Sequence, residues 1–169
     1  MWFTLLSVGV FGFFVSTDLF TMFMFYEVAL IPMYLLIGVW GSGRKEYAAM
    51  KLTLMLMGGS AFLLIGILGI FYGAGGETMN LLEIAKLHIP HEMQRIFFPL
   101  IFLGFGVLGA LFPFHTWSPD GHASAPTAVS MLHAGVLMKL GGYGCFRVAM
   151  YLMPEGCLLY TSPSPRDRQ

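Results

Sequence analysis

Residues 112–144 read FPFHTWSPDGHASAPTAVSMLHAGVLMKLGGYG, and this stretch decides the fold prediction. It joins two apolar runs through a polar segment with three prolines and two histidines, and Lys139 lies in the middle of the second run. A lysine at the centre of a membrane helix costs roughly 3 to 10 kcal/mol, so it is expected only where it faces protein or water. Lys139 lies about 20 Å from either end of its run, beyond the reach of about 6 Å of a lysine side chain. We therefore expect Lys139 to titrate or to move charge.

The composition is typical of a membrane protein. Hydrophobic residues make up 57% and charged residues 11% of the 169 residues, and the mean hydropathy is +0.74. Because no water-soluble domain of this length is so apolar, we expect an all-α protein that crosses the membrane several times. The net charge of zero argues against a nucleic-acid partner, since phosphate binding needs a basic surface. Cys145 and Cys157 are too few for a disulfide framework or a metal-ligand set, and we expect no cofactor in this chain.

Apolar runs separated by polar segments predict a bundle of about five transmembrane helices. The first run is shorter than the roughly 20 residues that span a bilayer, and Thr17 and Asp18 separate it from the second run with N-cap chemistry. Pro113 should break the fourth run near its inner end, which leaves one discontinuous helix of the kind that lines a protein or water cavity. The predicted helices cover residues 2–16, 19–40, 52–72, 96–115 and 127–153.

The basic residues predict how these helices are oriented in the membrane. Arg44, Lys45 and Lys51 lie in the loop of residues 41–51, which the excess of basic residues predicts to be cytoplasmic. Residues 73–95 then form an outer loop, in which the sequence NLLEIAKL predicts a short amphipathic turn at the interface.

The polar segment after the fourth run returns to the cytoplasmic side. Pro119, Asp120 and Gly121 favour a turn there, and Ser124 is placed to cap the helix that begins near Pro126.

Glu27 is the second charged residue inside an apolar run. Pro32 cannot donate a backbone hydrogen bond to Val28, so a carbonyl is freed one residue from the carboxylate and a polar pocket is expected there. An ionisable residue inside a membrane helix is a candidate for a functional site. The alternative is a neutral glutamic acid that a neighbouring helix satisfies.

Three histidines are candidates for proton exchange, because an unperturbed imidazole titrates near neutral pH. His115 and His122 are predicted to lie near the cytoplasmic mouth, where capping or turn bonding explains them equally well. His133 lies deeper, six residues before Lys139. Six residues turn an α-helix by about 600°, so these two side chains point about 120° apart and form a relay only through water or another side chain.

These motifs resemble a known family. The stretch from FPFHTW to KLGGYG, together with FYEVALIPMYLLIGVWG, residues 25–41, is similar to the antiporter-like subunit M (chain 4) family of proton-pumping NADH:quinone oxidoreductase, respiratory complex I. The resemblance covers residues 1 to about 155. It implies a fragment of a fourteen-helix antiporter-like fold, from about the fourth to the eighth helix, in which the match makes Glu27 and Lys139 members of a buried axis that moves protons.

One departure from the family pattern concerns this axis. The family usually carries Lys-x-Pro just before the Pro-x-His, whereas this chain has Leu108, Gly109 and Ala110 there. Glu27 therefore lacks the cation partner that the resemblance implies. His133, at a position that is more often aliphatic in the family, is the deep titratable group that could take its place.

The last residues differ from the rest in composition. CLLYTSPSPRDRQ, residues 157–169, is polar and rich in proline, has no periodicity, and resembles the translation of a sequencing adapter. We expect residues 1–156 to be the native membrane domain and residues 157–169 to be non-native.

The resemblance implies a proton-translocating subunit without redox chemistry of its own. It implies the inner (plasma) membrane of a bacterium, the lipid bilayer and other membrane-arm subunits as partners, and only indirect coupling to quinone. Two rivals share the charged residues: a subunit of a multisubunit sodium/proton antiporter and the membrane arm of a hydrogenase complex. A purely structural membrane subunit is a third alternative, which Leu108 favours.

Overall fold

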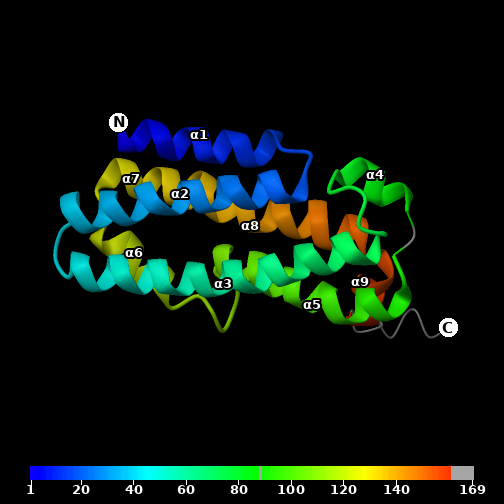
Figure 1. Ribbon diagram of the computed structural model, residues 1–169. Coiled ribbons are helices and arrows are strands. Elements are labelled where there is room, and N and C mark those ends of the chain that lie inside the picture. Colours follow the sequence, from blue (N-terminus) through cyan, green and yellow to red (C-terminus); the bar gives the residue numbers. More distant parts are fainter. Residues whose placement is uncertain (88, 161–169) are drawn as a thin grey trace.

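The computed structural model describes residues 1–87 and 89–160. These residues form a helical bundle with no strand, apart from one isolated bridge between Asp18 and Asn80. Figure 1 shows the long helices lying side by side along one axis. The elements are α1 (Trp2–Val15), α2 (Leu19–Trp40), α3 (Lys45–Gly73), α4 (Leu81–Lys86), α5 (His91–Leu108), α6 (Trp117–Ser124), α7 (Thr127–Leu132), η1 (His133–Leu137), α8 (Met138–Gly144), η2 (Cys145–Met150) and α9 (Pro154–Tyr160).

The predicted helices are present, and two of them begin earlier than predicted. α3 starts at Lys45 and α5 at His91, because the polar residues that precede the apolar runs, such as KEYAAMK, are good helix formers. α2 and α3 are each long and apolar enough to cross a membrane. The short amphipathic helix of the outer loop is confirmed as α4, whose first turn is capped by Asn80: its side chain accepts a hydrogen bond from the Leu82 N–H at 3.0 Å.

The last predicted helix runs without a break from Thr127 to Leu152, but it is not a regular α-helix. Two π-helical turns, η1 and η2, lie on either side of α8. A π turn widens the helix locally and is frequent at functional sites. Lys139 belongs to α8, and His133 is the first residue of η1.

Close contacts between small residues hold the helices together. Gly9 of α1 faces Ala29 of α2, where an added Cβ would lie 3.1 Å from the Ala29 Cβ. Gly104 of α5 packs against the Gly59 carbonyl of α3 in the same way. Gly residues allow such close approach between membrane helices.

Each end of the bundle is tied by backbone hydrogen bonds. The Ser42 N–H donates to the Ser124 carbonyl at 2.9 Å, which puts the basic loop and α6 at one end. The Leu19 N–H donates to the Met79 carbonyl at 3.0 Å, which puts the α1–α2 connection and the outer loop at the other end. The two loops that were predicted to lie on opposite sides of the membrane are therefore at opposite ends of the bundle (Figure 1).

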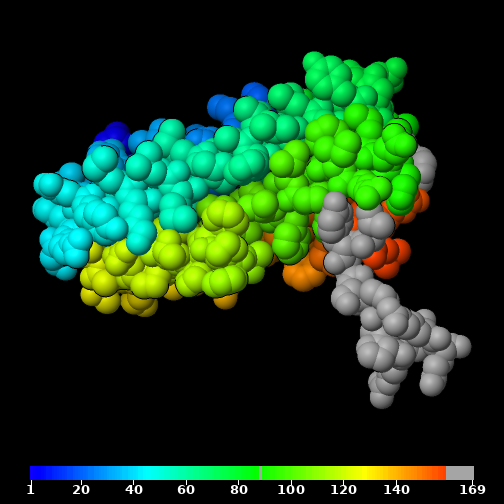
Figure 2. All heavy atoms as spheres, turned by 90° about the horizontal axis from the view of Figure 1, so that it is seen from below, coloured from blue at the N-terminus to red at the C-terminus, as the bar shows by residue number. Residues whose placement is uncertain are grey.

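The broken helix differs from the prediction. α5 ends at Leu108, five residues before Pro113, and Gly109 packs against Gly141 near the middle of the Thr127–Leu152 helix. The break therefore lies near mid-depth, not near the inner end. The helical path is interrupted at Ala110, which has a φ of 56°, and the chain continues into α6, whose residues lie beside the first half of α3 (Figure 2).

Two local predictions for the linker were wrong. Pro119, Asp120 and Gly121 lie inside α6 and form no turn, because proline is tolerated in the first turn of a helix, where its missing N–H is not needed. Ser124 does not cap α7. It is the last residue of α6, and Pro126 takes the N-cap position of α7.

α9 continues from Pro154 through Cys157 to Tyr160. Residues 161–169, most of the segment predicted to be non-native, lie outside the described residues. The boundary between residues 156 and 157 therefore stays a prediction.

Candidate functional site

Two of the candidate histidines lie in contact, His122 in α6 and His133 at the start of η1. His133 Nδ1 is 3.2 Å from His122 Nε2, and His122 Nδ1 is 3.1 Å from the Ser130 hydroxyl. His133 is 2% exposed, whereas His122 is only half-buried. The three side chains form a hydrogen-bonded chain that leads from a partly exposed imidazole into the interior of the bundle. This arrangement can carry a proton, because each ring nitrogen can donate or accept.

Trp117 packs against this pair. Its indole ring meets the His133 ring edge to face, with centroids 5.3 Å apart and an angle of 75°. Its indole N–H donates to the Val107 carbonyl at 3.1 Å. Trp117 is the first residue of α6 and Val107 lies in the last turn of α5, so this bond joins the two halves of the broken helix.

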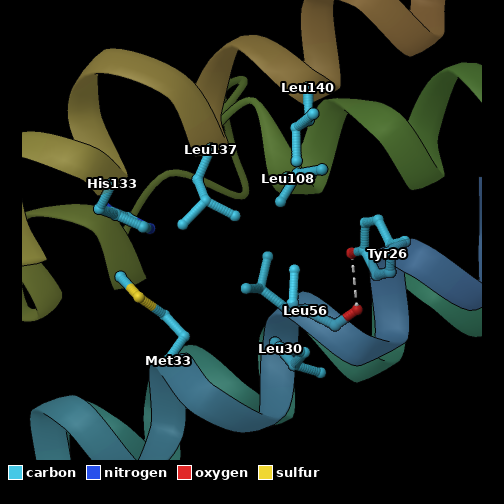
Figure 3. A pocket seen from close by; sticks show the side chains of 9 residues that line it. Tyr26, Leu30, Met33, Leu56, Leu108, His133, Leu137 and Leu140 are labelled. Atoms are coloured by element: carbon cyan, nitrogen blue, oxygen red, sulfur yellow. Dashed lines mark hydrogen bonds between the residues drawn. The ribbon is translucent and has the colours of Figure 1, made fainter. Parts of the chain in front are cut away.

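A cavity of about 10 Å³ lies beside His133, close to the minimum of roughly 10 to 15 Å³ that holds one water. Figure 3 shows His133 and Tyr26 on opposite sides of this cavity, with leucines between them. The Tyr26 hydroxyl donates to the Leu56 carbonyl of α3 at 3.1 Å. The nine residues that line the cavity are Tyr26, Ala29, Leu30, Met33, Leu56, Leu108, His133, Leu137 and Leu140.

Leu108 is one of these lining residues and is 3% exposed. The position at which the family pattern expects a lysine therefore points into the space between α2 and the His133 side of the site (Figure 3).

Glu27 follows Tyr26 on α2. Its Oε1 atom is buried and accepts no hydrogen bond from any described residue. α2 continues through Pro32 to Trp40 without interruption. A buried carboxylate oxygen without a hydrogen-bond donor is unfavourable. The described part of the chain supplies no such donor to Glu27 Oε1.

Lys139 lies on another face of the site. Its side chain is exposed and faces a groove of about 360 Å³, which Phe105, Gly109 and Tyr143 also line. No ion pair joins Lys139 to Glu27 within residues 1–87 and 89–160. An added Cβ at Gly135 or Gly142 would meet no atom within 4 Å, so no described residue packs closely against the helix face around Lys139.

His115 does not belong to this site. It lies in the linker between α5 and α6, is exposed, and stacks on Phe112 with ring centroids 5.5 Å apart. The neighbouring Thr116 hydroxyl contacts the Met55 sulfur at 3.5 Å, and Met55 lies roughly 15 Å along α3 from its first residue. The prediction that His115 lies at the cytoplasmic mouth was wrong, because α6 inserts about two further turns between His115 and that end.

Sequence reasoning missed three residues of the site: Tyr26, Trp117 and Ser130. Tyr26 could have been noticed as a polar aromatic residue next to Glu27 in an apolar run. The contact between His122 and His133 depends on how the chain turns at Ala125 and Pro126, which the spacing of 11 residues does not reveal. No cluster of three potential metal ligands occurs among the described residues.

The sequence matches a family of known proteins. The family model described as "NADH:quinone oxidoreductase/Mrp antiporter, TM" matches residues 16–160. The chain is 42% identical over 154 residues to chloroplastic NAD(P)H-quinone oxidoreductase chain 4 of Citrus sinensis, covering 90% of this chain and 31% of the relative. It is 44% identical over 145 residues to a chain 4 of Picosynechococcus sp., covering 85% of this chain and 26% of the relative. The chain thus spans between about a quarter and a third of the length of these curated relatives.

Solved structures show the same fold. Respiratory complex I from Thermus thermophilus matches with a TM-score of 0.85 at 28% identity, over 91% of this chain and 33% of that chain. The archaeal membrane-bound sulfane sulfur reductase matches with a TM-score of 0.84 at 30% identity, over 94% and 33%. The Mrp complex from Dietzia sp. matches with a TM-score of 0.77 at 24% identity, over 89% and 28%, which is a likeness of fold alone.

Proposed function

The chain belongs to the NADH:quinone oxidoreductase/Mrp antiporter transmembrane family, and we propose that it is part of a proton-translocating subunit of an NADH:quinone oxidoreductase. In this proposal five residues take part in moving protons: Glu27, Lys139, His133, His122 and His115. Of these, His115 acts as an exposed group at the helix break. The subunit carries no redox centre in this chain and is driven by quinone reduction elsewhere in the complex.

The observation that carries the proposal is the hydrogen-bonded chain Ser130–His122–His133 at a helix broken near mid-depth. A broken membrane helix is tolerated where it lines protein or water. Here α6, the helix that follows the break, places His122 in contact with His133, beside a cavity that Tyr26 of α2 also lines. Glu27 on the same helix has a buried oxygen that lacks a donor among the described residues. Tyr26 and His133 therefore lie on opposite sides of the cavity, and Glu27 follows Tyr26 on the same helix.

The missing lysine changes how the path would work. With Leu108 in the cavity wall, the charged axis lacks a cation between Glu27 and Lys139. His133 lines the same cavity from the other side, and we propose that it takes over the role of the lysine as the proton carrier at this position.

The proposed partners are other membrane-arm subunits of the complex and the lipid bilayer. Relatives of this chain are named as chains of NAD(P)H-quinone oxidoreductases, and two of the solved structures are described as respiratory complexes. Contact with quinone would be indirect. Cyanobacterial relatives support the inner (plasma) membrane of a bacterium as the location, although chloroplast relatives are equally similar.

An alternative is a subunit of a sodium/proton antiporter or of another respiratory membrane complex, a hydrogenase complex among them. The match to the archaeal sulfane sulfur reductase, at 30% identity, favours the second of these. The genes next to this one distinguish the candidates, since genes for a quinone-reducing arm favour complex I.

Substitutions of Lys139 test the proposed function. We expect Lys139→Ala in the assembled complex to lower the number of protons moved per quinone reduced, and Lys139→Arg to lower it as well, because an arginine cannot release its proton. The control is Lys86→Ala, which removes an exposed lysine of α4 at the outer end. Proton uptake and quinone reduction are measured in the same vesicles. A Lys139→Ala complex that moves as many protons per quinone as the Lys86→Ala complex would refute the proposed function.

A further inference from the structure

Trp117 has the largest side chain among the fully buried residues of the described chain, with 0% exposure. A tryptophan at the start of a short polar helix is not required by helix propensity. Its two specific contacts are an indole N–H bond to the Val107 carbonyl of α5 and an edge-to-face contact with the His133 ring. One side chain therefore touches both the helix break and the deeper histidine of the pair.

We propose that Trp117 is a positioning residue for proton transfer: it holds the His133 ring in the orientation that keeps its Nδ1 atom on His122 Nε2. This inference rests on the proposed function, because the His122–His133 contact matters only if a proton passes through it.

The surroundings of His133 explain why its ring needs such a support. Within the described part of the chain, its ring nitrogens make one hydrogen bond, the 3.2 Å contact of Nδ1 with His122. The cavity on its other side is lined mainly by leucine and methionine side chains, which offer an imidazole no hydrogen bond (Figure 3). A flip of the imidazole ring would replace Nδ1 by a carbon atom at His122 and break this contact, and the apolar lining of the cavity offers no hydrogen bond that would oppose the flip. In this proposal the indole ring, packed against the imidazole, opposes it.

Trp117 is itself fixed by the broken helix. The indole N–H donates to the Val107 carbonyl in the last turn of α5. Carbonyls in the last turn of a helix have no N–H donor from a following turn. A shift of α5 against α6 would therefore move the indole ring, and the His133 ring with it. This links the geometry of the break to the histidine contact.

Simple core packing is the competing explanation, and Phe13 is the matched control. Phe13 is also 0% exposed and makes edge-to-face contacts with three aromatic rings, those of Phe14, Phe105 and Tyr143, none of them a histidine. Phe13→Leu and Trp117→Leu both remove a fully buried aromatic ring from the bundle.

A double-mutant cycle with His133 tests the inference. The assembled complex is prepared with Trp117→Leu, His133→Leu, both changes together, and Phe13→Leu, and the number of protons moved per quinone is measured for each. If Trp117 acts through His133, Trp117→Leu lowers this number to about the value of His133→Leu, and the double variant is no lower. Trp117→Phe, which keeps a ring but has no N–H, should give a value between the parent and Trp117→Leu.

Two results would overturn the inference. One is that Trp117→Leu and Phe13→Leu give the same number of protons per quinone. The other is that the effects of Trp117→Leu and His133→Leu add in the double variant. Lys139→Ala in the same series separates the two proposals: if it lowers the number while either of these results is obtained, the proposed function stands and the role of Trp117 fails. If Trp117→Leu does not assemble, the cycle is completed with Trp117→Phe, and the same additivity criterion decides.

Discussion

Leu108 is the residue at which this chain departs most clearly from its family pattern. It is buried in the wall of the cavity, with Tyr26 on one side and His133 on the other (Figure 3). Leucine offers no charge to the buried Glu27 oxygen that lacks a donor. In the proposed function, the proton path at this depth then depends on the imidazole of His133, which can accept and release a proton, and not on a lysine.

Restoring the lysine tests this interpretation. Leu108→Lys places an ammonium near the α2 side of the cavity, and its attraction to a carboxylate a few ångströms away is on the order of a few kcal/mol at an effective dielectric of about 20. We expect the number of protons moved per quinone to rise relative to the parent. Leu108→Met is the control, because it keeps the volume and adds no charge. Equal values for the two variants would show that position 108 does not communicate with Glu27.

The broken helix and the Thr127–Leu152 helix meet through glycine. An added Cβ at Gly141 would lie 2.5 Å from the Gly109 nitrogen and 2.6 Å from the Phe105 carbonyl oxygen, both backbone atoms that cannot move aside as a side chain can. An added Cβ at Gly142, the next residue, would meet nothing within 4 Å. The contact between α5 and α8 that positions the break is therefore set at Gly141.

Two neighbouring substitutions test this contact. Gly141→Ala should destabilise the protein by about 1 to 3 kcal/mol, because the helices must separate to admit the methyl group. Gly142→Ala should be neutral or stabilise the protein by up to about 1 kcal/mol, because alanine is the better helix former. The midpoint of thermal unfolding in detergent measures both. A Gly141→Ala midpoint equal to that of Gly142→Ala would contradict the close approach of the helices at this point.

The sequence predicts the elements better than it predicts the site. Apolar runs mark α2, α3 and the Thr127–Leu152 helix, since a helix in an apolar environment must be apolar on nearly all sides. α6 is not evident, because WSPDGHAS contains a proline, a glycine and few apolar residues, and its contacts with neighbouring helices such as α3 support it. Lys51 of α3 pairs with Asp120 of α6 at 2.7 Å, one of the contacts that hold it there.

The contact between the histidines could not be predicted for a similar reason. His122 and His133 are separated by the end of α6, a bend at Pro126 and the whole of α7. The angle of such a bend depends on packing against other helices and not on the residues of the bend alone. Glu27 and Lys139, by contrast, are evident from the sequence, because a charge inside an apolar run is conspicuous wherever the helix lies.

At the scale of the whole molecule, the two ends of the bundle are predicted to lie on opposite sides of the membrane. The basic loop, residues 41–44, lies with α6 at one end, and residues 74–80 lie with the α1–α2 connection at the other. The excess of basic residues predicts that the first end is cytoplasmic.

Single-cysteine labelling tests this orientation in a background without Cys145 and Cys157. Ser42→Cys and Glu77→Cys introduce thiols at exposed positions of the two ends. In sealed, right-side-out vesicles, a membrane-impermeant maleimide should label position 77 and should label position 42 only after the vesicles are opened. Labelling in the reverse order would show that the bundle is inserted the other way round, and the histidine pair would then open to the outer side.

The central claim is that this chain moves protons through a buried acidic group, and Glu27 tests it most directly. Glu27→Gln keeps the size of the side chain and removes its ability to carry a proton, while Glu83→Gln makes the same change at an exposed position of α4. The measurement is the number of protons moved per quinone reduced by the assembled complex in sealed vesicles. We predict that Glu27→Gln lowers this number and that Glu83→Gln leaves it at the value of the parent. Equal numbers for the two variants would contradict the claim.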